Sequence, residues 1–168
     1  GIQRLTLLRD VLILSGAGVG GGSLVYPNTL IEPGEAFYAS RQARRLAPDL
    51  RERLRPHFET ARRMLGAAPT PRTFAADRVL SEVAGDLGRA ATFQMAPVGV
   101  YFGEAGITAA DPYFAGAGPE RAGCVFCGGC MVGCRHNAKN TLTKNYLPLA
   151  QRRGARIYSR CSVVRLEE

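Results

Sequence analysis

The amino-acid sequence predicts an α/β fold in which strand-forming segments at the two ends flank a helical, loop-rich stretch. Residues 5–14 and 155–166 are apolar and typical of strands, whereas residues 35–87 repeat their apolar positions at helical spacing. The 46% hydrophobic and 21% charged content is that of a soluble globular protein. With 20 glycines and 10 prolines in 168 residues, we also expect much of the backbone to lie in loops.

The first third of the chain alternates between strand, loop and helix signals. Residues 5–14 predict one buried strand, a glycine loop follows at 15–23, and residues 24–31 read as an extended segment. Helices are predicted over 35–46, 48–65 and 76–87, with Pro56 as a kink and Gly66 and Gly88 as helix ends.

The remaining chain carries less regular structure. Residues 96–119 predict a long irregular excursion over a larger scaffold, since loops of that length are uncommon unless they are functional. A cysteine cluster follows, then a predicted helix over 138–153 and a predicted strand over 155–166. The sequence opens at Gly1 without an initiator methionine and stops directly after that strand, so we expect an internal fragment.

The net charge of +8 comes largely from one arginine-rich stretch, which alternates with leucine, phenylalanine and methionine at helical spacing. This pattern predicts a solvated helix face and no nucleic-acid partner. Its members are Arg41, Arg44, Arg45, Arg51, Arg53, Arg55, Arg62 and Arg63. The sequence has no apolar run of the roughly 18–20 residues that a membrane span needs, so we expect no transmembrane segment and a cytoplasmic location.

The glycine loop matches the pattern G-x-G-x-x-G from Gly16 to Gly21, and Glu35 follows at the distance of a ribose-binding acid. A complete dinucleotide site also needs a helix that starts in the glycines, and Pro27 opposes such a helix. We therefore interpret residues 20–22 as a bare backbone surface on which a planar ligand can lie. The alternative is a turn that merely lets two elements cross closely.

The run from Gly18 to Val25 resembles the second flavin-contacting segment of the glucose–methanol–choline (GMC) oxidoreductases, in particular the cholesterol-oxidase-like branch. The likeness is most specific at residues 133–140, the "GC…AK" element. It also covers Glu32-Pro33, Met64-Leu65-Gly66, Pro97-Val98-Gly99, Asp111-Pro112-Tyr113-Phe114, Tyr146-Leu147, Ala150 and Gly154-Ala155. It implies a fragment of a Rossmann-like FAD-binding domain with a helical, loop-rich insertion and a cysteine-rich loop.

The resemblance also implies roles for individual parts. Residues 1–34 and 138–168 would be flavin-domain pieces, 35–123 the helical excursion and 124–137 the cysteine cluster. The implied FAD contacts are Gly20, Gly21, Gly22, Ser23 and Asn28 at the isoalloxazine and Val163 at the adenine. Tyr26 stands where the family has an asparagine, and Asn28 would take over that contact. The family's catalytic histidine lies near its C-terminus, so we expect no catalytic residue in this sequence and no activity from it alone.

The implied reaction is oxidation of the CH–OH group of an alcohol or sterol by hydride transfer to FAD. The electron acceptor would be oxygen, a quinone or a redox protein. Two rival functions remain: a small iron–sulfur electron carrier, and a zinc-stabilised basic binding module.

The spacing Cys124-x2-Cys127-x2-Cys130-x3-Cys134 is the strongest pattern in the sequence, because four thiols with glycines between them can surround one small centre. An iron–sulfur cluster, a zinc ion and purely structural cysteines are the three alternatives. Cys161 stands apart, and we expect it to be a small buried side chain.

Overall fold

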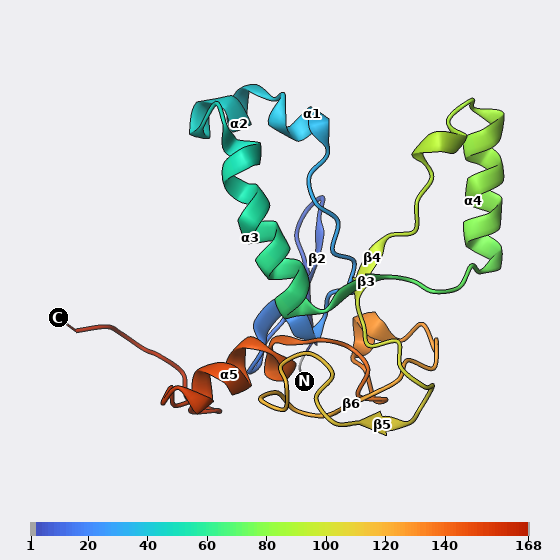
Figure 1. Ribbon diagram of the computed structural model, residues 1–168. Helices are drawn as coiled ribbons and strands as arrows, with labels where there is room; N and C mark the ends of the chain where they lie inside the picture. The colour runs from blue at the N-terminus through green and yellow to red at the C-terminus, as the bar shows by residue number, and fades with distance from the viewer. Residues whose placement is uncertain (1–2, 168) are drawn as a thin grey trace.

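The computed structural model describes residues 3–167, which form short strands, helices and long connecting loops (Figure 1). The strands are β1 (Gln3–Leu7), β2 (Leu12–Gly16), β3 (Ala67–Pro69), β4 (Pro97–Gly99), β5 (Thr108–Ala109) and β6 (Arg121–Ala122). The α-helices are α1 (Glu35–Tyr38), α2 (Arg41–Leu46), α3 (Leu50–Leu65), α4 (Ala75–Asp86) and α5 (Tyr146–Arg152). The 3₁₀ helices are η1 (Gly21–Leu24), η2 (Ala90–Thr92), η3 (Cys130–Val132) and η4 (Leu142–Lys144).

The strands pair as three antiparallel two-stranded sheets, β1 with β2, β3 with β4 and β5 with β6. This mixture of helices and small sheets is compatible with a fragment of an α/β protein. The predicted Rossmann-like sheet is not among the described pairings and stays a prediction.

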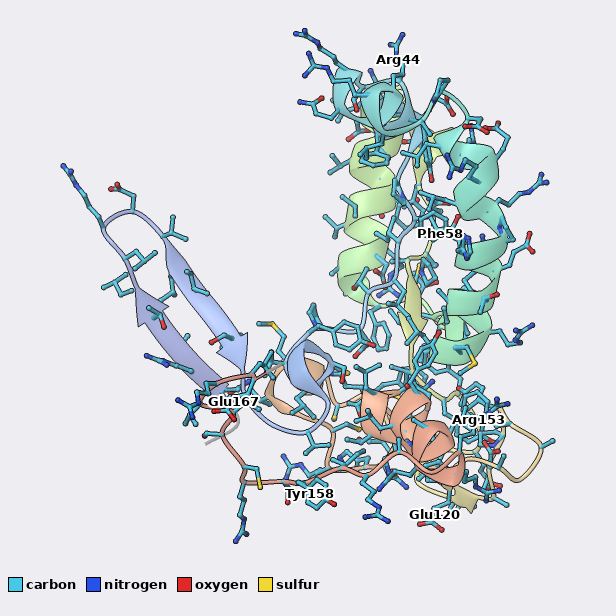
Figure 2. The ribbon with its side chains drawn as sticks, turned by 90° about the vertical axis from the view of Figure 1, so that its left-hand side faces the viewer. Arg44, Phe58, Glu120, Arg153, Tyr158 and Glu167 are labelled. Atoms are coloured by element: carbon cyan, nitrogen blue, oxygen red, sulfur yellow. The ribbon has the colours of Figure 1, made fainter. Side chains whose placement is uncertain are left out.

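The predicted single buried strand over 5–14 is wrong. The segment is a hairpin in which Leu5 faces Leu14 across β1 and β2, and the Leu8 N–H donates to the Val11 carbonyl across the turn at 2.9 Å. The polar pair Arg9-Asp10 lies in this turn, where it splits the apolar run into two strands. The hairpin stands clear of the helices in Figure 2, and its leucines are largely exposed.

The helices beyond the hairpin follow the sequence signals closely. The predicted helix over 35–46 is divided into α1 and α2 because Ser40 is extended and caps α2, accepting a hydrogen bond from the Ala43 N–H at 3.1 Å. α3 contains Pro56 and ends at Gly66 in the left-handed conformation, as predicted. All eight arginines of the predicted solvated face are exposed on α2 and α3. Arg44, on α2, is labelled at the top of Figure 2.

The C-terminal part departs from its prediction. The helix expected over 138–153 is reduced to α5, because the backbone of residues 138–140 pairs with β4 and its extension: the Tyr101 N–H donates to Ala138 O at 2.9 Å and the Asn140 N–H to Gly99 O at 2.8 Å. The strand expected over 155–166 is wrong, since these residues are irregular and exposed. Within residues 3–167 no strand lies alongside them to complete a ladder.

The interior around residues 100, 122 and 138–140 is small and polar. Arg121 is fully buried, and its guanidinium donates to Asn140 Oδ1 at 2.8 Å, to Pro119 O at 2.7 Å and to Lys144 O. Burial lowers the pKa of Arg121, and its carbonyl partners tie the irregular excursion to the segment before α5. The glycine and cysteine segments lie against this interior.

None of the described helices has the length and apolarity to cross a membrane.

Candidate functional site

The glycine segment forms a short 3₁₀ turn, η1, that ends before Pro27. Gly20 and Gly21 have φ values of 110° and 53°, which side-chain-bearing residues rarely adopt. A Cβ at Gly21 or Gly22 would meet no other atom within 4 Å, so one side of this backbone is open. The prediction that no α-helix starts in these glycines is confirmed. Gly20 is covered by Leu24 and Thr143, so the bare surface is limited to Gly21 and Gly22, and a planar ligand on it stays a prediction.

The hydroxyl group of Ser23 already has hydrogen-bond partners within the protein. Its hydroxyl donates to Gly20 O at 2.6 Å and accepts from the Leu142 N–H at 2.9 Å. The side chain therefore holds the glycine turn against η4. A contact between Ser23 and a flavin stays a prediction.

Asn28 lies on a different surface, in a cavity that we call the aromatic pocket, with a volume of about 310 Å³. Its remaining wall consists of Thr70, Phe74, Val98, Val100, Phe102, Cys124, Phe126, Gly128 and Cys130. Asn28 is only 5% exposed, has φ 56°, and its Oδ1 is buried without a hydrogen-bond partner in residues 3–167. A buried amide oxygen left without a donor is costly, so a donor from a bound molecule or from water would stabilise it.

The predicted contact residues do not all converge. The glycines of η1 do not line the aromatic pocket, although Tyr26 and Asn28 follow them directly in the chain. Val163 is 79% exposed on the irregular tail that carries Tyr158 and Glu167 in Figure 2. Its predicted contact with an adenine stays a prediction.

The four clustered cysteines do converge. Cys124, Cys127, Cys130 and Cys134 all line one small cavity of about 20 Å³, the cysteine cavity, together with His136 and Lys139. All four are free thiols. Two receive backbone hydrogen bonds: the Phe126 N–H donates to Cys124 Sγ at 3.3 Å and the Ala138 N–H to Cys134 Sγ at 3.4 Å.

The cavity does not form a ready site for one metal ion. Among residues 3–167 no three cysteine, histidine or acidic side chains are placed to hold such an ion. Burial raises the pKa of Cys124, and the hydrogen bond from the Phe126 N–H partly offsets this rise.

The expectation that Cys161 is buried is wrong. Cys161 lies exposed on the irregular tail, because the strand that would have buried it is not formed.

Lys139 connects the cysteine cavity to the glycine segment, and the sequence alone gave it no role beyond the "AK" likeness. It is 3% exposed, and its Nζ donates to Leu24 O at 3.3 Å and Cys130 O at 2.9 Å while lying 4.6 Å from the centre of the Tyr26 ring. Burial lowers its pKa, and the nearby Cys130 and Cys134 oppose that effect. The buried ammonium group of Lys139 thus holds the carbonyl of Leu24, the last residue of η1, next to the segment that carries the four cysteines.

The chain is similar to curated proteins over nearly its whole length. It is 53% identical over 162 residues to a protein named cholesterol oxidase from Mycobacterium tuberculosis, recorded for the strains H37Rv and CDC 1551, which covers 94% of this chain and 28% of the relative. It is 40% identical over 168 residues to a cholesterol oxidase of Acinetobacter baumannii, covering 98% of this chain and 30% of the relative. No protein-family profile matches the chain. No solved structure matches it either.

These relatives are oxidoreductases by name, and the chain corresponds to one segment of them. More particularly, it belongs to the cholesterol-oxidase-like branch that the glycine segment and the "GC…AK" element indicate, so the resemblance seen in the sequence is confirmed. The chain spans 28% to 30% of the length of these relatives.

Proposed function

We propose that this chain forms part of the flavin site of an FAD-dependent oxidoreductase that oxidises the CH–OH group of a sterol. The similarity to proteins named cholesterol oxidase, at 53% and 40% identity, carries the proposal. The rest of the enzyme would supply the catalytic histidine, so the chain alone would be inactive. Oxygen is the acceptor that the relatives' name favours, with a quinone or a redox protein as the alternatives.

The residues present fit a flavin at two places. The open side of Gly21 and Gly22 would accept a flat ring without steric conflict. The unpartnered Oδ1 of Asn28, on the separate surface of the aromatic pocket, would accept a hydrogen bond from an N–H donor. When bound, FAD would supply the oxidising power by taking up the hydride of the alcohol carbon. The chain's own task would be to position the ring and to exclude water from it.

The division of the chain follows from this role. We assign residues 1–34 and 138–168 to the flavin-binding part, with 35–123 as the helical excursion and 124–137 as the cysteine cluster. The hydrogen bonds of Ser23 to Leu142 and of Lys139 to Leu24 support the pairing of the first two segments. Gly1, Ile2 and Glu168, at the outer limits of these segments, lie outside the described residues.

Substitution of Gly22 tests the flavin surface. Because a side chain at Gly22 meets no atom of the protein, Gly22→Val should leave the fold intact but cover the face on which the ring would lie. We expect at least a tenfold loss of FAD affinity in the full-length protein, a change of about 1.4 kcal/mol. FAD content, measured from visible absorbance and release on denaturation, reports it.

Gly34→Val is the matched control, since Gly34 is extended, equally open and remote from η1. Equal FAD content in both variants would remove the glycine surface from the proposal. Full-length wild-type protein that binds no FAD and oxidises no sterol would overturn the function as a whole.

A second candidate is an iron–sulfur cluster in the cysteine cavity, which would pass electrons between the flavin and an external acceptor. The convergence of all four cysteines on one cavity and the two N–H···S hydrogen bonds support it. Against it, no three metal-ligating side chains in residues 3–167 are placed to hold a metal ion. Cys127→Ser should abolish any bound iron and acid-labile sulfide, whereas Cys161→Ser, on the exposed tail, should not. Wild-type protein without iron would exclude the cluster and leave the flavin proposal untouched.

A further inference from the structure

The aromatic pocket is built around three phenylalanine rings that come from separate segments of the chain. The ring centroids of Phe102 and Phe126 lie 5.8 Å apart, and the ring planes are inclined by only 15°, which makes them a stacked pair. The rings of Phe74 and Phe126 lie 5.9 Å apart at 50°. Aromatic rings at these distances attract one another, so the three side chains form one apolar wall.

Arg72 holds two of these rings together. Its guanidinium carbon lies 4.8 Å from the centre of the Phe74 ring and 4.9 Å from the centre of the Phe126 ring. Cations are attracted to the faces of aromatic rings, so this one side chain joins the start of α4 to the cysteine-rich loop. Arg72 does not itself line the pocket, and no charged side chain of the described residues does.

Asn28 supplies an unsatisfied polar group in this uncharged lining. Its Oδ1 is buried and has no hydrogen-bond partner in residues 3–167. The backbone at this position is fixed, because the Gly99 N–H donates to the Asn28 carbonyl at 2.9 Å and Thr29 bridges to Val98. The amide is therefore held at the pocket wall. An uncharged O–H donor would satisfy its oxygen without bringing a charge into an apolar site.

We infer that the aromatic pocket binds a small planar aromatic molecule that carries a hydroxyl group, that is, a phenol in the chemical sense. The ring of this molecule packs against the phenylalanine wall, and its O–H donates to Asn28 Oδ1. The volume of about 310 Å³ is at the lower end of the range of about 300–1,000 Å³ that ligand sites span, so it suits one or two fused rings.

This site is additional to the flavin surface of the proposed function. Gly21 and Gly22 do not line the aromatic pocket, so a flavin ring that lies on them leaves the pocket free for a second molecule. Asn28 then serves that second molecule instead of the flavin.

The test compares two probes that share one ring system, 2-naphthol and 2-methoxynaphthalene, in fluorescence titrations of the full-length protein with its cofactor retained. We expect 2-naphthol to bind about fivefold more tightly, because only its O–H can donate to Asn28 Oδ1. Asn28→Gly should make the two affinities equal, and glycine tolerates the φ of 56° at this position. Phe102→Leu should weaken both probes by a similar factor, since it removes a ring from the wall.

Asn137→Gly is the matched control, because Asn137 has a φ of 59° and does not line the pocket. It should leave both affinities unchanged. Equal affinities of the two probes for the wild type overturn the inference. Displacement of 2-naphthol by FAD or by cholesterol also overturns it, since the pocket would then belong to the flavin or to the sterol. If the wild type holds no FAD but keeps its preference for 2-naphthol, the proposed function fails and the phenol site stands.

Discussion

Arg121 and Lys139 show how single side chains organise this molecule. Both are buried cations, and in residues 3–167 both are held by carbonyl groups, with no carboxylate in contact. A buried charge persists only where several hydrogen bonds replace the lost water. Each of these side chains therefore joins segments far apart in the sequence: Arg121 reaches Asn140 and Lys144, and Lys139 reaches Leu24.

Asp111 is an anion in the irregular stretch of residues 96–119 that is likewise held by several hydrogen bonds. Partial burial alone would raise its pKa, but its carboxylate accepts hydrogen bonds from the backbone N–H groups of Gly118 at 2.8 Å, of Tyr113 and Phe114 at 3.0 Å and of Gly116 at 3.1 Å, and these lower the pKa overall. The folded protein therefore binds this proton less readily than the unfolded chain does. The stabilisation is complete above the ordinary aspartate pKa and is lost as the pH falls through the lowered value.

We expect Asp111→Ala to reduce the free energy of unfolding by about 2 kcal/mol at neutral pH, since four backbone donors lose a charged acceptor. The difference from wild type should shrink in strongly acidic solution, where the carboxyl group is protonated. Urea unfolding of the full-length protein at several pH values measures it. Asp10→Ala, at the exposed hairpin tip, should have little effect at any pH, and a loss that does not depend on pH would contradict the role of the carboxylate.

Among the elements, those that rest on local signals were predictable. The helix α4 lies within one residue of its predicted bounds at each end, and α3 ends at the predicted glycine, because apolar spacing and C-terminal glycines act within a few residues. The hairpin, the backbone of residues 138–140 and the tail at 155–166 were predicted wrongly. Their conformation depends on which distant strand is available for pairing, which local patterns do not encode.

The features of the candidate site also differ in whether the sequence could predict them. The bare glycine surface could be predicted because it requires only the absence of side chains. The aromatic pocket around Asn28 and the role of Lys139 could not, since Phe74, Phe102 and Phe126 reach the pocket from separate segments. The cysteine spacing predicted their convergence correctly but did not decide what they hold.

Gly66 tests the junction of α3 with the interior. Its φ is 59°, and a Cβ there would overlap the Asn140 amide and lie 2.7 Å from the Tyr113 ring. Gly88, after α4, has a similar φ of 66° but open space around it. We expect Gly88→Ala to cost about 1 kcal/mol of folding stability from backbone strain alone, and Gly66→Ala about 3 kcal/mol because overpacking adds to it.

Thermal unfolding of the two variants of the full-length protein gives the comparison. Equal losses of stability would show that the packing of Asn140 and Tyr113 against Gly66 contributes nothing.

For the molecule as a whole, the apolar interior is small. The buried apolar residues of the described part are Val25, Ala43, Ala47, Val100, Ala122 and Ala138. Larger side chains on the hairpin, on α4 and on the tail stay exposed, among them Leu7 at 79% and Val164 at 93%. In soluble proteins, extensive exposed apolar surface is typical of sites that contact other molecules.

We therefore expect an isolated chain of residues 1–168 to unfold without a sharp transition and to bind the dye ANS, since little apolar surface is buried to offset the conformational entropy of folding. Circular dichroism on heating and ANS fluorescence measure this, with the full-length protein as the control. A cooperative melt with native-like amide protection in the isolated chain would contradict the expectation.

The bonds that fix the glycine turn also set the moment at which it can become ordered during synthesis. The partners of Tyr26, Leu24 and Ser23 lie 114, 115 and 119 residues further along the chain. At a translation rate of about 5–20 residues per second, the turn waits roughly 6–24 seconds after leaving the ribosome before those partners follow. A flavin would then enter a chain that is nearly complete through this region, and uptake of the cofactor by shorter nascent chains should be negligible.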